Sequence, residues 1–387
     1  MDQPPTIPFN RPRPLGREVE YITDAFARGH ISGDGFYTRK ATGLLERELG
    51  TTVLLTTSCT HALEMAALLL EIGPGDEVIV PAFTFPSTIN AFVLRGAVPV
   101  FADIRPDTLN LDERLVERHI TPRTKAIVPV HYAGVACEMD ELVAVADRHR
   151  VAMVEDNAHA LFGKYKGRLL GTFGRLSTLS FHETKNFTCG EGGALLINDP
   201  QLRDRAEILR EKGTDRSRFF RGEVDKYGWV DIGSSYVLSD LLAAVLFAQL
   251  ERRDEVQARR AEIWNTYFDR LGGWAGSNGV TLPVASSPVI DHAYHLFHVL
   301  MPTGRARAGL IAHLKQRGVM SVFHYLPLNR SIMGLKLSTT PHACPVAEDV
   351  SERLARLPFF TTLTDAEVAD VVEAVTSYRV CPGDRRG

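Results

Sequence analysis

Lys185 occupies a position that does not suit a solvated surface cation. It lies in the segment Ser180-Phe-His-Glu-Thr-Lys-Asn186, between an apolar run and the glycine-rich turn Gly190-Glu-Gly-Gly193. A partly buried lysine has a lowered pKa, because its ammonium group loses solvation, and the neutral amine is a nucleophile and a proton carrier. Lys185 is therefore a candidate for forming a Schiff base with an aldehyde.

A carboxylate upstream complements this amine. The apolar run Val151–Glu155 ends at Asp156 and continues as Asn157-Ala-His159. The carboxyl ends of parallel strands are where open α/β sheets bind ligands, and a carboxylate there can keep a pyridine nitrogen protonated. Lys185 and Asp156 together predict pyridoxal phosphate as the cofactor. Two alternatives stay open: Asp156 as a helix N-cap, and His159 as a core histidine instead of a neighbour of the ring.

Two further segments offer groups for the rest of this cofactor. Ser58 and Thr60 stand where a strand gives way to a helix, and a helix N-terminus favours a phosphate, to which Ser180 would add a hydroxyl. Phe85, after the next strand, is placed to stack on the pyridine ring. Taken singly, Ser58 and Thr60 also fit plain N-caps, and Phe85 also fits core packing.

These residues belong to a stretch in which short apolar runs alternate with amphipathic segments. The runs predicted as strands are Val53–Thr56, Glu77–Val80, Val98–Phe101, Lys125–Val130 and Val151–Glu155, and the helices between them include Thr60–Leu70, Ser87–Leu94 and Met139–Arg148. Such alternation predicts an α/β fold with a mostly parallel sheet covered on both faces.

A second, smaller unit is predicted toward the C-terminal end. Leu241–Arg260 reads as one long helix that bridges two domains, and mixed strand-like and helical segments follow it. We place a large cofactor-binding domain with an N-terminal arm at residues 1–250 and a small α+β domain at residues 251–387. A chain of 387 residues is long enough for this division.

The composition argues against several classes of protein. A formal net charge of −3 does not suit a protein that coats nucleic acid or anionic lipid. No apolar run approaches the length of a membrane span, and the first residues lack the apolar segment of a secretory signal. The five cysteines show no spacing typical of zinc or disulfides. We therefore expect a cytoplasmic enzyme without a metal site.

Taken together, the motifs resemble the nucleotide-sugar aminotransferases of the DegT/StrS type. The resemblance runs from Pro8 to the last predicted helix, and the block around Lys185 with Gly190–Gly193 is its most specific part. It implies pyridoxal phosphate fold type I, which is aspartate aminotransferase-like, with a large domain built on a mostly parallel seven-stranded sheet. It also implies a homodimer with active sites at the subunit interface.

The resemblance implies a role for each matching residue. Lys185 is the Schiff-base lysine, Asp156 pairs with the pyridine nitrogen and His159 lies beside the cofactor. It also implies that Thr60, His61 (through its backbone) and Ser180 bind the phosphate and that Phe85 stacks on the ring. Ser58 and Ser235 are further candidates for cofactor binding. Ser235 departs from the family pattern, because many members carry an asparagine there that reaches the phosphate across the dimer. Whether the shorter hydroxyl makes this contact directly or through water stays open.

Three further segments look like a narrower subgroup, which makes dTDP-4-amino-4,6-dideoxy-D-galactose. They are Arg210–Arg216, Phe219–Tyr227 and Asp231–Tyr236, and Phe323–Leu328 belongs to the same pattern. The subgroup implies L-glutamate as amino donor and dTDP-4-keto-6-deoxy-D-glucose as acceptor. The candidate substrate-binding residues are Arg216, Arg221, Lys226 and Tyr325. Each of the three basic residues fits equally well as part of a solvated charged loop that binds no ligand.

Other functions fit parts of the pattern. Related sugar dehydratases replace the lysine with histidine, so Lys185 argues against dehydration. An NAD-dependent dehydrogenase is excluded, because no G-x-G-x-x-G motif follows a strand. Two alternatives remain: a C4 aminotransferase acting on another dTDP-ketosugar in the biosynthesis of glycoside natural products, and a nonenzymatic regulator built on the same fold.

Overall fold

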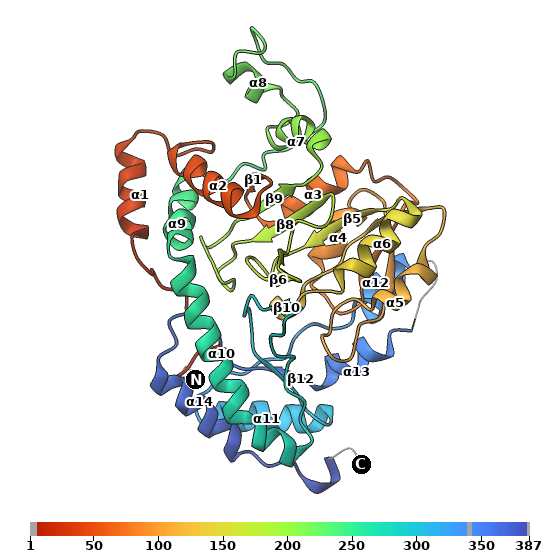
Figure 1. Ribbon diagram of the computed structural model, residues 1–387, viewed down its shortest axis with the longest axis vertical. Helices are drawn as coiled ribbons and strands as arrows, with labels where there is room; N and C mark the ends of the chain where they lie inside the picture. Colours follow the sequence, from red (N-terminus) through yellow and green to blue (C-terminus); the bar gives the residue numbers. More distant parts are fainter. Residues whose placement is uncertain (1–5, 339–342, 385–387) are drawn as a thin grey trace.

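The computed structural model describes residues 6–338 and 343–384, and a seven-stranded sheet forms the centre of its larger part (Figure 1). The strand order is β1-β9-β8-β5-β4-β2-β3. The strands are β1 (Thr52–Thr56), β2 (Glu77–Pro81), β3 (Val98–Ala102), β4 (Thr124–Ile127), β5 (Ala152–Asp156), β8 (Leu176–Ser180) and β9 (Gly193–Ile197). Only β9 runs antiparallel to its neighbours β1 and β8. The expectation of a mostly parallel sheet is confirmed.

Helices cover both faces of this sheet. The helices of this larger part are α1 (Glu18–Ala27), α2 (Phe36–Leu49), α3 (Cys59–Leu69), α4 (Ser87–Val93), α5 (Glu113–Val116), α6 (Met139–His149), α7 (Arg203–Arg210), α8 (Arg216–Phe220) and α9 (Asp240–Glu251), of which α8 projects away from the sheet (Figure 1). Short 3-10 helices lie at Glu117–His119, Tyr132–Gly134 and Pro200–Leu202, and a small sheet joins β6 (Lys164–Tyr165), β7 (Arg168–Leu169) and β10 (Ile290–Asp291).

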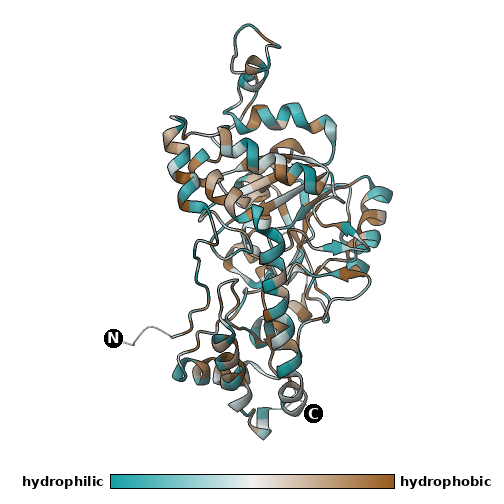
Figure 2. Cartoon of the chain, turned by 60° about the vertical axis from the view of Figure 1, so that its left-hand side comes forward, coloured by the Kyte–Doolittle hydropathy of each residue, from teal (hydrophilic) through white to brown (hydrophobic). Residues whose placement is uncertain are grey.

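Alternate strand residues explain why both faces are covered. On β2, Val78 and Val80 pack in the apolar cluster of α3 and α4, whereas Ile79 packs in the cluster of α6. On β9, Leu195 joins the first of these faces and Leu196 joins the cluster of α2 and α9. Successive side chains of a strand point to opposite faces, so a strand buried on both sides is apolar throughout. Figure 2 shows this concentration of hydrophobic residues in the central strands.

The smaller part has its own apolar core. Trp264, Tyr267 and Phe297 are almost completely buried in it. Its elements are α10 (Arg253–Asn278), β11 (His298–Leu300), α11 (Gly304–Gln316), a 3-10 turn (Leu328–Arg330), α12 (Ile332–Leu337), α13 (Pro345–Arg353), β12 (Leu354–Arg356), α14 (Asp365–Ser377) and a second 3-10 turn (Pro382–Asp384). β11 and β12 pair antiparallel.

Helix α13 ties the two parts together. It lies within residues 251–387, yet Ala347 and Val350 pack in the apolar cluster of the large sheet. The Asp103 carboxylate, just after β3, accepts hydrogen bonds from the backbone N–H groups of Val346 and Ala347 at 3.0 and 2.9 Å. The position of this helix relative to the sheet is therefore fixed by both apolar and polar contacts.

The prediction of a single helix over Leu241–Arg260 is wrong in one respect. The chain forms two helices, α9 and α10, which are separated at Arg252, with φ −103° and ψ 21°. No glycine or proline marks this break, and the helical periodicity is the same on both sides. The pattern therefore could not reveal it. Within the described residues, no helix is long and apolar enough to cross a membrane.

Candidate active site

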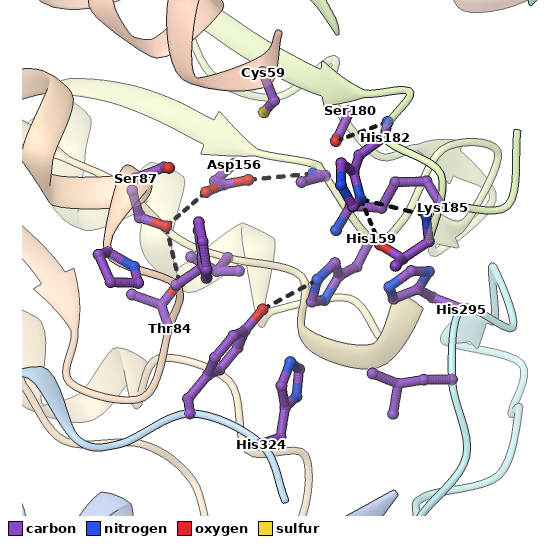
Figure 3. Close-up of a pocket in the computed structure, with 18 of the residues that line it drawn as sticks. Cys59, Thr84, Ser87, Asp156, His159, Ser180, His182, Lys185, His295 and His324 are labelled. Atoms are coloured by element: carbon purple, nitrogen blue, oxygen red, sulfur yellow. Dashed lines mark hydrogen bonds between the residues drawn. The ribbon is translucent and has the colours of Figure 1, made fainter. Parts of the chain in front are cut away.

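A cavity of about 850 Å³ opens at the carboxyl edge of the sheet, between the two parts of the molecule. It receives Asp156 from the end of β5 and Ser180 from the end of β8. In Figure 3, the side chains of Asp156, His159 and Lys185 converge on the same space. The predicted site residues that line it are Ser58, Thr60, Phe85, Asp156, His159, Ser180, Lys185 and Tyr325.

Lys185 reaches the cavity from the turn after β8. Its backbone N–H donates to the carbonyl of His182 at 2.9 Å, which holds the turn closed. The turn leads into Gly193, where any side chain would collide with the backbone of Ser58 and Cys59, so β9 can approach the start of α3 only because glycine stands there. Burial lowers the pKa of Lys185 to about 8, although Cys59 and Asp156 act in the opposite direction. This lowered pKa enlarges the neutral fraction of the amine near neutral pH, which suits an amine that attacks carbonyls.

Asp156 is buried and hydrogen-bonded. Its Oδ2 accepts from the Thr88 hydroxyl at 2.7 Å, and its Oδ1 accepts from the backbone N–H of Ala158 at 3.2 Å. Burial raises the pKa of Asp156, whereas these two hydrogen bonds and the charge of Lys185 oppose the rise. A cation placed against this carboxylate would favour its ionised form, as a protonated pyridine nitrogen requires.

His159 lies under a layer of aromatic rings. Its ring stacks on His295 with centroids 4.2 Å apart, and its Nε2 lies 3.3 Å from the Tyr325 hydroxyl. Nδ1 accepts the backbone N–H of Ala133 at 3.4 Å. Burial lowers the pKa of His159 well below its ordinary value, and the charge of Lys185 adds to this. The histidine is therefore neutral, and it is both a buried residue and a wall of the cavity.

Hydroxyl groups gather at the start of α3. Ser58 is the N-cap of this helix, and its side chain accepts the backbone N–H of His61 at 3.1 Å. The predicted phosphate donor of His61 is thus already bonded within the cap, and His61 does not line the cavity. Thr60 donates to the hydroxyl of Ser87 at 2.9 Å, and Ser180 lies beside the same cavity. A helix N-terminus with several hydroxyls nearby is suited to a phosphate.

Two aromatic residues form the opposite wall. The ring of Phe85 is 57% exposed and lies 6.2 Å from the ring of Tyr325. Tyr325 has a positive φ of 31°, which is rare for a residue with a side chain and typical of positions under functional constraint. Phe85 is free on its cavity side to stack on a planar ligand.

Besides His61, four predicted residues do not line the cavity of their own chain. Arg216, Arg221 and Lys226 belong to residues 212–232, which we call the arm; it carries α8 away from the sheet (Figure 1). Arg221 pairs with Glu207 and Glu223 at 2.6 Å each. Ser235 is exposed and forms an isolated antiparallel bridge with Glu211, next to the arm. A single chain does not bring these residues together with Lys185.

The sequence did not single out several residues that complete the cavity. Thr88 lies in a segment already noted for Phe85, so its partnership with Asp156 could have been suspected. Cys59, Ser87 and His324 likewise stand within or beside segments already noted, next to Ser58, Thr88 and Tyr325. His295 and Arg356 come from other parts of the chain and have no local motif.

The match to known proteins extends over almost the whole chain. Residues 16–376 match the model of the DegT/DnrJ/EryC1/StrS aminotransferase family. The chain belongs to this family. An uncharacterized protein of Methanocaldococcus jannaschii is 34% identical over 384 residues, which cover 95% of this chain and 96% of that protein.

Solved structures agree with the assignment. A Streptococcus pneumoniae protein described as a sugar aminotransferase, solved in its pyridoxal and pyridoxamine phosphate forms, is 30% identical with a TM-score of 0.88, covering 96% of this chain and 98% of that chain. DesV of S. venezuelae is 32% identical with a TM-score of 0.87, covering 97% of this chain and 98% of that chain. The fold type expected from the sequence is confirmed.

The described residues fit pyridoxal phosphate, the cofactor of this aminotransferase. An amine with a lowered pKa, a buried carboxylate and a hydroxyl-rich helix start surround one cavity. These are the groups that an aldehyde, a pyridine nitrogen and a phosphate need. Lys185, Asp156 and the hydroxyls near Thr60 are the residues that would hold it.

Proposed function

We propose that this aminotransferase moves an amino group from L-glutamate to C4 of dTDP-4-keto-6-deoxy-D-glucose. The products are 2-oxoglutarate and dTDP-4-amino-4,6-dideoxy-D-galactose. The observation that carries the proposal is Lys185, an amine with a lowered pKa that shares one cavity with the buried carboxylate of Asp156. The likeness to proteins described as sugar aminotransferases supports a sugar as the acceptor.

The chain's residues divide the work of proton transfer. When bound, pyridoxal phosphate supplies a ring that accepts electrons from the carbon next to the transferred nitrogen. Lys185 would hold the aldehyde group, and its Nζ would take the Cα proton of the donor amino acid. Asp156 would keep the ring nitrogen protonated, and Thr88 and Ala158 hold Asp156 in place. In the second half-reaction Lys185 moves a proton at C4 of the sugar, so donor and acceptor alternate in ping-pong order.

The residues at the mouth of the cavity support the proposal that the acceptor is a 6-deoxy sugar. Phe85, Phe323 and Leu326 line it and are 57%, 53% and 68% exposed. An apolar rim of this kind suits the methyl group of a 6-deoxyhexose better than a hydroxymethyl group. Other dTDP-ketosugars with a methyl group at the same position remain the second candidate acceptors.

We propose a homodimer in which each arm serves the partner's site. The arm exposes Phe220, Tyr227 and Trp229 by 70%, 51% and 82%, and Figure 2 shows hydrophobic residues along it. Exposed apolar surface on such a scale favours burial against another protein. Arg216, Arg221, Lys226 and Ser235 would then reach the nucleotide diphosphate and the phosphate of the partner.

The test is a coupled assay of the purified enzyme with pyridoxal phosphate, L-glutamate and a panel of dTDP-4-keto sugars. We expect 2-oxoglutarate to form fastest with dTDP-4-keto-6-deoxy-D-glucose, and NMR of the product to show the galactose configuration. Faster turnover of another ketosugar, or the other configuration at C4, would replace the proposed acceptor. No 2-oxoglutarate with any ketosugar would refute the proposed reaction.

A further inference from the structure

Arg356 lies in the wall of the same cavity, far from the motifs around Lys185. It is the last residue of β12 and belongs to the smaller part of the molecule. Among the described residues that line the cavity, Lys185 and Arg356 are the only lysine or arginine side chains. The site thus holds one cation assigned to the cofactor and a second whose function is open.

The guanidinium of Arg356 is fixed on two sides. Its Nε and Nη2 both donate to the carbonyl of Phe323, at 3.3 and 3.1 Å. The ring of Phe9 lies against the guanidinium, with its centroid 4.6 Å from Cζ. These contacts set the plane of the group, and Nη1 makes no hydrogen bond within the described chain. An arginine held in this way can offer its Nη1–Nη2 edge to an anion at little cost in conformational entropy.

No carboxylate of the described residues neutralises this arginine. Arg356 takes part in no ion pair there, in contrast to Arg353 three residues earlier, which pairs with Asp349. The acidic side chains of the cavity are Asp156, which is bonded to Thr88, and Glu191, which lies 3.6 Å from His182. A partly buried arginine without an acidic partner is suited to a ligand that brings the negative charge.

We infer that Arg356 binds the α-carboxylate of the amino donor, and this inference rests on the proposed transamination from an α-amino acid. The planar, forked guanidinium matches a carboxylate through two parallel hydrogen bonds. Such a contact would orient the donor so that its Cα faces the amine of Lys185. The subsite would therefore select α-amino acids over simple amines.

The diphosphate of the nucleotide sugar is the other anion that enters this cavity. In a hexose it is attached at C1, across the ring from C4, so it lies far from the atoms that react. The α-carboxylate is instead bonded directly to the reacting carbon. Arg356 is close enough to Lys185 to contribute to the lowering of its pKa. This proximity favours the carboxylate over the diphosphate.

The test measures each half-reaction separately, by the absorbance of the bound cofactor, in the holoenzyme and in Arg356→Met and Arg356→Lys. We expect Arg356→Met to lower kcat/KM for L-glutamate about a hundred-fold, mainly through KM, since a buried charged partner is lost. Arg356→Lys keeps the charge without the fork and should recover part of this loss. The reaction of the pyridoxamine form with dTDP-4-keto-6-deoxy-D-glucose should change less than about two-fold in both variants. Arg305→Met is the matched control, because Arg305 is 83% exposed in the same part of the molecule.

A second readout does not need turnover. Calorimetric binding of 2-oxoglutarate to the pyridoxal form should weaken in Arg356→Met and remain unchanged in the Arg305 control. An unchanged donor half-reaction, a selective loss of the sugar half-reaction, or an equal loss of both would each overturn the inference. If the unmodified enzyme reacts with no α-amino acid at all, the proposed function fails, which is distinguishable from the failure of Arg356 alone.

Discussion

Two regions of the molecule differ in almost every physical respect. One is the floor of the cavity, by which we mean Lys185, Asp156 and His159, and the other is the arm. Lys185, Asp156 and His159 are held by hydrogen bonds, stacking and burial, and burial shifts the pKa of each. The arm carries exposed aromatic side chains and charged residues that pair with one another, such as Arg218 with Glu223 at 3.3 Å. One chain supplies all the residues of the floor, whereas the large apolar side chains of the arm are exposed to solvent.

This contrast indicates which parts of the reaction one chain can perform. A site that tunes pKa values needs burial, and burial needs the packed sheet and helices on both sides. A site that recognises a long nucleotide needs reach, which the arm would supply in the proposed dimer. We therefore expect changes in the floor to affect both half-reactions, and changes in the arm to affect only the sugar half-reaction.

The largest effect is expected from Lys185→Ala. Loss of the amine removes both the attachment of the cofactor and the proton carrier, so kcat should fall at least about a thousand-fold in both half-reactions. Stopped-flow absorbance of the bound cofactor measures this directly. Lys125→Ala, an exposed lysine at the far end of the sheet, is the control. A variant at Lys185 with nearly full activity would show that another group moves the proton.

Asp156→Asn should come next, with a loss of about a hundred- to a thousand-fold. The neutral amide cannot hold the proton on the ring nitrogen, so both half-reactions slow while the cofactor still binds. Rapid-mixing experiments with L-glutamate and with the ketosugar give the two rates. Asp140→Asn, an exposed residue paired with Lys166, should leave both unchanged. A loss confined to one half-reaction would contradict the shared role of the floor.

Thr88→Val should produce a smaller effect with a characteristic pH dependence. The hydrogen bond from Thr88 to Asp156 stabilises the ionised carboxylate and lowers its pKa, and such a bond contributes about 1.5–3 kcal/mol. Without it the pKa of Asp156 rises, so activity, which requires the ionised form, is lost at a higher pH as the solution is acidified. The acidic limb of the pH–kcat profile should therefore move toward neutral pH, with about a ten-fold loss of kcat on that limb. An unmoved acidic limb would mean that Thr88 does not control Asp156.

The arm should give the smallest effect. Arg221→Ala removes one exposed cation, so KM for the dTDP-ketosugar should rise only several-fold, as is typical of solvent-exposed charges. The donor half-reaction should stay the same. Steady-state kinetics at varied sugar and at varied L-glutamate separates the two, with the exposed Arg379→Ala as control. An effect on L-glutamate would show that the arm and the floor are not separate in function.

Much of the floor could be predicted because its chemistry is local in sequence. Asp156 ends the strand β5 and Lys185 follows the strand β8, and strand ends of one sheet meet at one edge. The alternation of strands and helices gave the mostly parallel sheet for the same reason: each element carries its own periodicity. Ser58 kept the capping role that its position before α3 allows, and its hydroxyl is bonded to His61.

The rest depends on contacts between distant segments. Arg356, at the end of β12, contacts Phe9 and Phe323, and His295 stacks on His159 across the boundary between the two parts. No spacing in the sequence encodes such neighbours. The arm shows a second limit of prediction from sequence. The pattern of a charged segment is the same whether the segment binds a ligand, contacts a partner protein or faces water.

We propose that Lys185 and Asp156 serve one amino group in two successive reactions. The most direct measurement follows the absorbance of the bound cofactor while L-glutamate is added first, without sugar, and dTDP-4-keto-6-deoxy-D-glucose second. We predict conversion to the pyridoxamine form with one equivalent of 2-oxoglutarate, and then full return of the original spectrum with one equivalent of aminosugar. No change with L-glutamate, or no return with the ketosugar, would contradict the claim.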